Sequence, residues 1–274
     1  MMNRDSMIIK AEELVTRLND PALRIYDATI LFFSSDPNAS SYEAYLKGHI
    51  PGAAVFDHLQ FSDPDGKYEY TMLPAAEIAA QIGRIGIAAE SEVILYASSV
   101  LPSAARAWWI LRYAGHEHVR MLNGGLDAWT KAGGTLEQEP RQYPPAMFEG
   151  RFKPEMFASM EEVRTAMDDA AVLTEYALPL EMYGGAHIPG SVSHSCLNLI
   201  TEDMNTLHSD EVILPQLKEG AGHERVITYC GGGIAAALNA MAHLIAGHEN
   251  VALYDGSLLE WMGEGQPTAG AEEA

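Results

Sequence analysis

Cysteine is scarce in this 274-residue chain, which contains only Cys196 and Cys230. Two cysteines cannot form the disulfide framework of a small secreted domain, and they are too few for a zinc site built from several thiolates. No run of 18 apolar residues occurs, so no membrane-spanning helix is predicted. The first ten residues show no pattern of a targeting presequence. We therefore expect a cytoplasmic protein that needs no metal and no cofactor.

Basic residues are also in short supply. The chain has 17 Lys and Arg against 38 Asp and Glu, which gives a formal net charge of −21. Such a surface repels the phosphate backbone, so nucleic acid is not an expected partner. An anionic substrate would need strong local hydrogen-bond donors to overcome the same field.

The chain does contain enough apolar material for two hydrophobic cores, since 47% of its residues are hydrophobic and 20% are charged. Its length suits two domains of about 130 residues each. Three segments recur in the same order, 132 to 138 positions later. These pairs are 47–53 with 185–191, 93–96 with 226–229, and 119–126 with 251–258. The ordered recurrence predicts a duplicated domain.

Short apolar runs alternate with stretches of helical periodicity in both halves. Strands are expected at 23–27, 53–56, 92–96, 119–122, 172–173, 226–229 and 251–254, and helices at 75–85, 103–114, 126–132 and 235–246. This alternation predicts an α/β fold of two tandem domains, each a parallel sheet with helices on both faces. Three prolines within 137–145 indicate a stiff connector. We therefore divide the chain into 1–137, a linker at 138–156, and 157–274.

The sequence around Cys230 carries the clearest chemical signal. An expected strand ends at Tyr229, an expected helix begins near Ala235, and Cys230 with three glycines lies between them. Glycines allow successive N–H groups to point at one spot, and a helix N-terminus adds partial positive charge. A thiolate is the nucleophilic form of cysteine, and this environment favours it. The alternative is a buried cysteine before an ordinary turn, for which one glycine would suffice.

The corresponding loop of the first half, Ala97-Ser98-Ser99-Val100, lacks both cysteine and glycine. It cannot carry sulfur on a thiol. We expect the first half to have a structural role and to form one side of the active site of the second half.

Several ordered motifs resemble those of the two-domain rhodanese superfamily, which includes thiosulfate and 3-mercaptopyruvate sulfurtransferases. The resemblance covers nearly the whole chain. It rests on Tyr26-Asp27-Ala28-Thr29, Gly48-His49-Ile50-Pro51-Gly52-Ala53, Arg106-Ala107-Trp108-Trp109, Leu122-Asn123-Gly124-Gly125, Tyr254-Asp255-Gly256-Ser257 and Glu260-Trp261.

The resemblance implies that Cys230 is the active cysteine, which becomes a persulfide, and that its six-residue loop cradles the anionic sulfur. The cradle would consist of Gly231, Gly232, Gly233, Ile234 and Ala235. Cys230-Gly231-Gly232-Gly233 is nearer the mercaptopyruvate type of loop, but Gly232 replaces the hydroxyl residue of that type.

The family also has two substrate-binding arginines near the start of the second domain. We align Tyr176 with the first of them, and no Arg or Lys occurs between Arg164 and Lys218. A bidentate clamp for small anions is therefore missing.

Other residues remain open to two interpretations. Glu175, Tyr176, Tyr183, His194 and Trp261 are candidates for the substrate pocket, with His194 as a substitute anion donor, but each is also compatible with a structural role. Cys196 is either a resolving thiol or a small core residue.

Three functions are compatible with these residues. The first is a sulfurtransferase that moves sulfane sulfur from mercaptopyruvate or thiosulfate through Cys230 to a thiol or cyanide. The second is a persulfide carrier without small-molecule turnover, for which a sulfur-accepting or sulfur-donating protein would be the partner. The third, a cysteine phosphatase or arsenate reductase, is disfavoured because the loop is short and contains no arginine.

Overall fold

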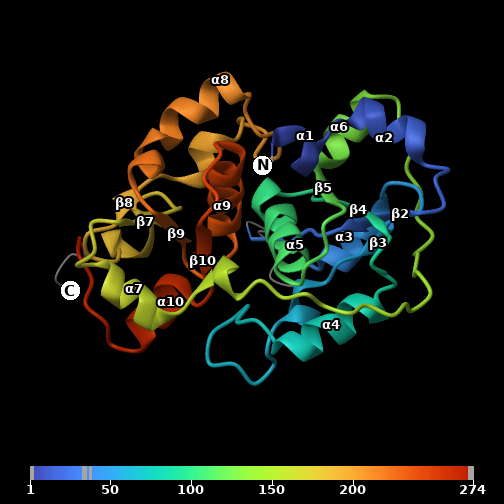
Figure 1. Cartoon of the computed structure of the whole chain (residues 1–274). Coiled ribbons are helices and arrows are strands. Elements are labelled where there is room, and N and C mark those ends of the chain that lie inside the picture. The colour runs from blue at the N-terminus through green and yellow to red at the C-terminus, as the bar shows by residue number, and fades with distance from the viewer. Residues whose placement is uncertain (1–2, 33–35, 37–38, 271–274) are drawn as a thin grey trace.

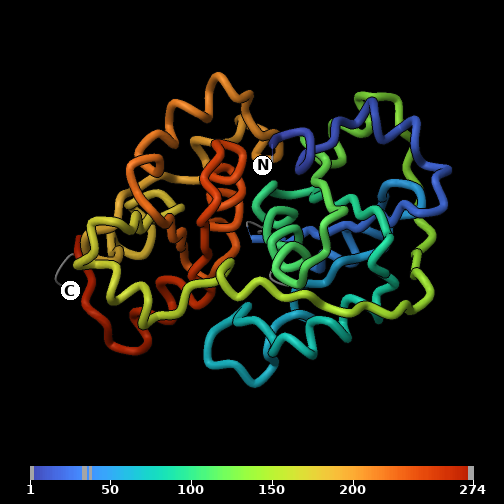
Figure 2. Tube along the Cα trace, in the orientation of Figure 1, coloured from blue at the N-terminus to red at the C-terminus, as the bar shows by residue number. Residues whose placement is uncertain are grey.

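The structure is a computed structural model that describes residues 3–32, 36 and 39–270. The two halves of the chain lie side by side, the first in blue to green and the second in yellow to red (Figure 1). Each half contains one five-stranded sheet. The tube in Figure 2 shows that the chain passes from one half to the other once, through the yellow-green segment.

The first sheet has the strand order β1-β5-β4-β2-β3, and every pairing is parallel. Its strands are β1 (Ile8–Ile9), β2 (Leu23–Asp27), β3 (Ala54–Val55), β4 (Glu92–Tyr96) and β5 (Val119–Leu122). The central strands are short apolar runs buried on both faces, as a parallel sheet requires.

The second sheet repeats this order as β6-β10-β9-β7-β8, again with parallel pairings. Its strands are β6 (Phe157–Ala158), β7 (Val172–Tyr176), β8 (Val192–Ser193), β9 (Arg225–Tyr229) and β10 (Val251–Tyr254). The identical topology confirms the predicted fold class of two tandem α/β domains.

Helices cover both faces of each sheet (Figure 1). Those of the first half are α1 (Arg4–Met7), α2 (Ala11–Arg17), α3 (Ser41–Lys47), α4 (Ala75–Arg84), α5 (Leu101–Tyr113) and α6 (Gly125–Lys131). Those of the second half are α7 (Met160–Ala166), α8 (Asp210–Ile213), α9 (Ala235–Ile245) and α10 (Ser257–Gly263). Five 3₁₀ segments of the described chain complete the list: η1 (His58–Phe61), η2 (Pro154–Met156), η3 (Met182–Gly185), η4 (Cys196–Leu199) and η5 (Leu214–Gly222).

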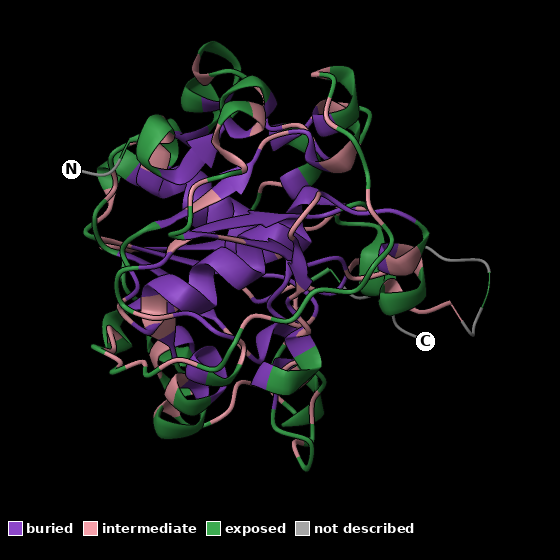
Figure 3. Cartoon of the chain, turned by 90° about the vertical axis from the view of Figure 1, so that its right-hand side faces the viewer, coloured by how far each residue is buried: buried purple, intermediate pink, exposed green. Residues whose placement is uncertain are grey.

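The helices α5 and α9 pack against each other where the two halves meet. Residues of α5 are buried continuously from Leu101 to Arg112, and those of α9 from Ala236 to Leu244. A helix that is buried all round lies inside a core, not on a surface. One hydrophobic cluster accordingly includes residues of both halves, and buried residues fill the centre of the molecule (Figure 3).

Residues 132–153 contain no helix or strand apart from two isolated bridges and run along the first half. Backbone hydrogen bonds hold this segment in place, including Ala146 N–H to the Gly83 carbonyl at 2.8 Å and Arg151 N–H to the Ala114 carbonyl at 2.9 Å. Among the described residues, no helix is both long and apolar enough to cross a lipid bilayer.

Candidate active site at Cys230

Cys230 lies directly after β9, at the carboxyl edge of the second sheet, and α9 begins five residues later. In open parallel sheets this edge is where ligands bind. The apolar strand stops because three glycines follow, and the helix begins where the alanine-rich stretch restores helix-forming residues. The Cys230 residue is only 2% exposed.

Hydrogen bonds tie the loop to the start of α10. The Cys230 N–H donates to Ser257 Oγ at 3.1 Å. The Leu258 and Leu259 N–H groups donate to the Cys230 and Gly231 carbonyls, each at 3.0 Å. Ser257 has a left-handed φ of 51°, a conformation that costs energy in a residue other than glycine. The strain indicates that the surroundings hold Ser257 firmly at its place beside the cysteine.

Five successive N–H groups, from Gly231 to Ala235, donate no hydrogen bond to any residue that the structure describes. They lie at the N-terminus of an 11-residue helix, where the helix dipole also favours negative charge. Such a set of free donors can bind an anion. No hydrogen bond reaches the Cys230 sulfur itself from the described part of the chain, so these donors are not used by the free thiol.

The three glycines have different steric environments. Gly233 has a left-handed φ of 78°, and an added Cβ would lie 2.7 Å from the Asp255 carbonyl oxygen. A Cβ on Gly231 would lie 2.1 Å from the Tyr183 hydroxyl. A Cβ on Gly232 would meet nothing closer than 3.7 Å. Gly233 is therefore required by its backbone and its neighbours, a side chain on Gly231 would have to displace the tip of Tyr183, and Gly232 has room for a side chain.

Arg106 reaches the loop from α5 of the first half. Its Nη2 donates to Asp255 Oδ1 at 2.5 Å and to the Tyr70 carbonyl at 3.1 Å, and its Nη1 donates to the Gly233 carbonyl at 3.4 Å. Asp255 also accepts from the Met72 N–H at 2.9 Å. The first half thus supplies a buried arginine and a loop that hold the cysteine loop in place.

Tyr176, Tyr183 and Cys196 lie near Cys230. Burial raises the pKa of each of the three side chains, and the charge of Cys230 raises it further. The pKa of the Cys196 thiol reaches about 12, so this thiol stays protonated at neutral pH. This environment favours the interpretation of Cys196 as a core residue.

Glu175 is buried in a polar cluster beneath α9. Its Oε1 accepts from Asn239 Nδ2 at 2.7 Å, and its Oε2 lies 3.1 Å from His243 Nε2 and 3.5 Å from His194 Nδ1. Burial opposes ionisation, but the two histidines outweigh it and lower the pKa of Glu175 to about 2. For His194, burial favours the neutral ring, but the hydrogen bond and charge of Glu175 favour the protonated ring more strongly. The net result is a raised pKa of His194. Glu175 and His194 are therefore engaged with each other inside the domain, which leaves Glu175 no surface for a substrate.

The structure corrects the expectation for Trp261. This side chain is fully buried against Tyr254, and its Nε1–H donates to the Pro267 carbonyl at 2.7 Å. It is a core residue and does not line a substrate pocket.

The register of the two sheets corrects the alignment of Tyr176. Tyr176 pairs with Tyr229 as Asp27 pairs with Tyr96, and the Ala177 and Ala28 N–H groups make equivalent hydrogen bonds of 2.8 Å. The family's Asp-Ala-Arg therefore corresponds to Tyr176-Ala177-Leu178, and our placement of Tyr176 at the arginine was wrong by two residues. The corrected alignment still places no arginine at this position, because Leu178 is apolar and cannot bind an anionic substrate.

Sequence reasoning gave no role to Ser257 and Asp255, although both belong to a segment that recurs in the two halves. Their position just after β10 could have identified them as site residues. Residues that follow neighbouring parallel strands, here β9 and β10, lie together at one edge of the sheet.

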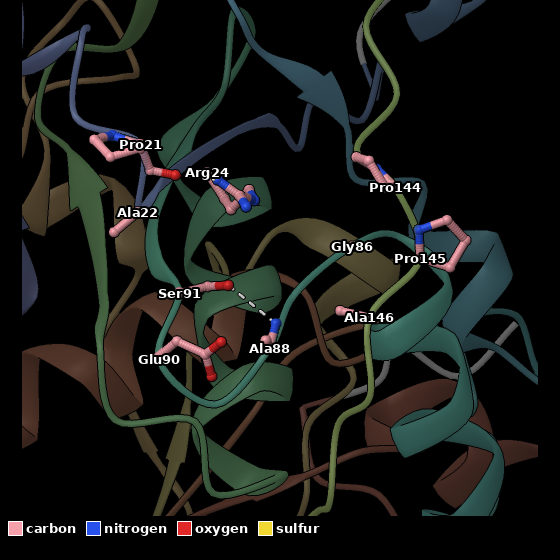
Figure 4. A pocket seen from close by; sticks show the side chains of 10 residues that line it. All are labelled: Pro21, Ala22, Arg24, Gly86, Ala88, Glu90, Ser91, Pro144, Pro145 and Ala146. Atoms are coloured by element: carbon pink, nitrogen blue, oxygen red, sulfur yellow. Dashed lines mark hydrogen bonds between the residues drawn. The ribbon is translucent and has the colours of Figure 1, made fainter.

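Two cavities open on the first half, away from Cys230. One of about 360 Å³ lies between the connector at Pro144 and Pro145 and the residues around Arg24 and Ser91 (Figure 4). The other, of about 680 Å³, continues along the same connector. Neither is lined by a residue of the second half. In the described ranges, no group of three or more His, Cys, Asp or Glu residues is arranged to hold a metal ion.

Comparisons with known proteins agree with this geometry. The model of the rhodanese-like domain matches residues 10–132 and 159–264. The chain is 30% identical to the thiosulfate sulfurtransferase of Bos taurus, with 90% of this chain and 87% of the relative covered. It is 30% identical to the 3-mercaptopyruvate sulfurtransferase of Escherichia coli (strain K12), with 92% and 94% covered.

The fold is likewise similar to a solved structure of this kind. The crystal structure of SseA from Escherichia coli, a 3-mercaptopyruvate sulfotransferase, superposes with a TM-score of 0.83 at 27% identity, covering 93% of this chain and 99% of that one. With two rhodanese-like domains over its length and sulfurtransferases among its full-length relatives, the chain belongs to the tandem rhodanese family of sulfurtransferases.

Proposed function

We propose that Cys230 carries the sulfur in a double displacement. In the first step the Cys230 thiolate attacks the transferable sulfur of the donor, which is the outer sulfur of thiosulfate or the thiol sulfur of 3-mercaptopyruvate. A new S–S bond forms, and the donor leaves with the electron pair of the bond that breaks. In the second step a nucleophilic acceptor takes the outer sulfur, and the pair of the S–S bond returns to Cys230 as thiolate. No net oxidant or reductant is needed.

The observation that carries this proposal is the set of unused N–H groups from Gly231 to Ala235 beside Cys230. A persulfide extends about 2 Å beyond the cysteine sulfur, the length of one S–S bond. The outer sulfur would be anionic, and free amides at a helix N-terminus are suited to stabilise it. The contacts of Cys230 and Gly231 with the start of α10 keep the loop in this shape.

The proposed donors are 3-mercaptopyruvate or thiosulfate, and the proposed acceptors are a thiol or cyanide. Leu178 at the position of the first family arginine offers no bidentate contact to either donor. Gly232 offers no hydroxyl, which the mercaptopyruvate type of loop carries. We therefore expect a high KM for both small anions.

Mass spectrometry after treatment with each donor tests the proposal. The Cys230 peptide should gain about 32 Da, the mass of one sulfur atom, and should lose it on addition of cyanide. Cys230→Ser should show neither change. If no sulfane donor adds sulfur to Cys230, the proposal is wrong.

The missing arginine clamp favours one second candidate: a persulfide carrier that receives its sulfur from a partner protein without turnover of small molecules. Steady-state assays with thiosulfate and 3-mercaptopyruvate separate the two functions. Rapid turnover of either free donor excludes the carrier.

A further inference from the structure

The proposed reaction leaves two tyrosine hydroxyls beside Cys230 without a role. Tyr176 is the last residue of β7 and is fully buried, with its ring 5.1 Å from that of Tyr229. Its hydroxyl has no hydrogen-bond partner among the described residues. Leaving a buried hydroxyl unpaired costs free energy, and buried polar groups in native proteins normally have partners.

The neighbouring Tyr229 shows that this part of the core can satisfy a phenol. The Tyr229 hydroxyl accepts from the Ile188 N–H at 2.9 Å and lies 2.7 Å from Ser191 Oγ. The unpaired state of Tyr176 is therefore specific to that residue and its position.

Tyr183 approaches the same loop from η3. Its hydroxyl lies against Gly231, where an added Cβ would be only 2.1 Å away. No described residue forms a hydrogen bond with it. Tyr183 has a left-handed φ of 54°, and Gly184 and Gly185 follow with positive φ as well. A strained backbone that holds a side chain over a reactive loop is typical of a functional site.

Both phenols remain protonated at neutral pH and can donate. Burial raises the pKa of Tyr176 and of Tyr183, and the negative charge of Cys230 raises both further. The backbone places both residues beside the cysteine: Tyr176 pairs with Tyr229, the residue before Cys230, and the Tyr183 hydroxyl lies against Gly231, the residue after it. In the described part of the second half, no lysine or arginine lies between Arg164 and Lys218 to perform the task instead.

We propose that the hydroxyls of Tyr176 and Tyr183 donate hydrogen bonds to the sulfur carried by Cys230, in place of the arginines of the family. This inference rests on the proposed function. Cys230 carries negative charge on sulfur twice, as the attacking thiolate and as the persulfide anion between the two displacements, and these hydroxyls donate to that sulfur without releasing their protons. The two tyrosines are thus catalytic residues that stabilise the negative charge on the sulfur carried by Cys230.

The variants Tyr176→Phe and Tyr183→Phe remove only the hydroxyls. We expect each to slow sulfur transfer to cyanide by about 10- to 100-fold, the effect of losing one hydrogen bond to a charged group. The Tm of Tyr176→Phe should not fall, because its hydroxyl has no bond to lose. Single-turnover mass spectrometry would measure how fast the persulfide forms and decays.

Tyr254→Phe is the matched control. The Tyr254 hydroxyl is also buried and has no hydrogen-bond partner at bonding distance among the described residues, and after burial the largest effect on its pKa comes from Glu260 on α10. Its sulfur-transfer rate should equal that of the wild type.

The outcomes separate this inference from the proposed function. If wild-type Cys230 forms a persulfide and both Phe variants keep the wild-type rates within twofold, the inference is overturned and the proposed function stands. A slower Tyr176→Phe variant whose Tm has also dropped would assign Tyr176 to packing and likewise overturn its role. If the wild type forms no persulfide, the proposed function fails and this inference fails with it.

Discussion

At the scale of single residues, the loop after Cys230 contains three glycines with different requirements. Gly233 combines a left-handed φ with close approach to the Asp255 carbonyl, and Gly231 is covered by Tyr183. Gly232 has neither constraint. A repeated glycine in the sequence therefore does not indicate a repeated function, and substitutions can distinguish the positions.

Gly233→Ala should destabilise the protein by about 1–3 kcal/mol and abolish most activity, because the new Cβ meets both backbone strain and the Asp255 carbonyl. Gly232→Ser should change the free energy of unfolding by less than about 0.5 kcal/mol, as expected for a site without special contacts. Urea unfolding of both variants measures the difference. Equal destabilisation of the two would contradict the described loop.

The buried carboxylate of Glu175 predicts how stability depends on pH. Its pKa in the folded protein is lowered from 4.5 to about 2. A lowered pKa contributes stability that is present above the unfolded value and is lost as the pH falls toward the folded value. The Tm of the wild type should therefore fall more steeply between about pH 4.5 and pH 2 than that of Glu175→Gln. Parallel curves for the two proteins would show that Glu175 is not ionised in the fold.

At the scale of elements, the sequence predicts helices and strands that have long apolar patterns and misses most of the very short strands. The buried runs at β4 and β9 and the alanine-rich α9 have clear patterns, and the structure confirms them within one or two residues. Of the four two-residue strands, the sequence predicts only β3, as part of the apolar run 53–56; β1, β6 and β8 are too short to show a period and are seen only in the sheets.

For the site, the position of Cys230 between strand and helix could be predicted, because the loop residues are consecutive. The contacts of Arg106 and Ser257 could not, since they depend on how separate elements meet at the sheet edge. The misplacement of Tyr176 has the same origin, because strand register is a property of the sheet.

The contact between α5 and the cysteine loop predicts strong coupling between Arg106 and Asp255. Removing one partner of a buried ion pair typically costs about 3–5 kcal/mol, because the other charge is left uncompensated. Arg106→Met should therefore destabilise the protein by several kcal/mol and reduce activity.

In the double variant Arg106→Met/Asp255→Asn, the loss of stability should be smaller than the sum of the two single losses. A double-mutant cycle from urea denaturation measures this difference. Strict additivity would mean that the pair is not coupled.

At the scale of the whole molecule, the two halves share one hydrophobic core through α5 and α9. We therefore expect thermal unfolding to occur in a single cooperative transition. Near-UV circular dichroism of the tryptophans, three of which lie in the first half and one in the second, should coincide with the far-UV signal. Two separate transitions would show that the halves unfold independently.

The central claim is that the free amides beside Cys230 hold an anionic sulfur. A crystal structure determined after treatment with a sulfane donor tests it most directly. We predict a second sulfur on Cys230 within about 3.5 Å of the N–H groups of residues 231–235. A second sulfur directed away from these amides, into apolar side chains, would contradict the account.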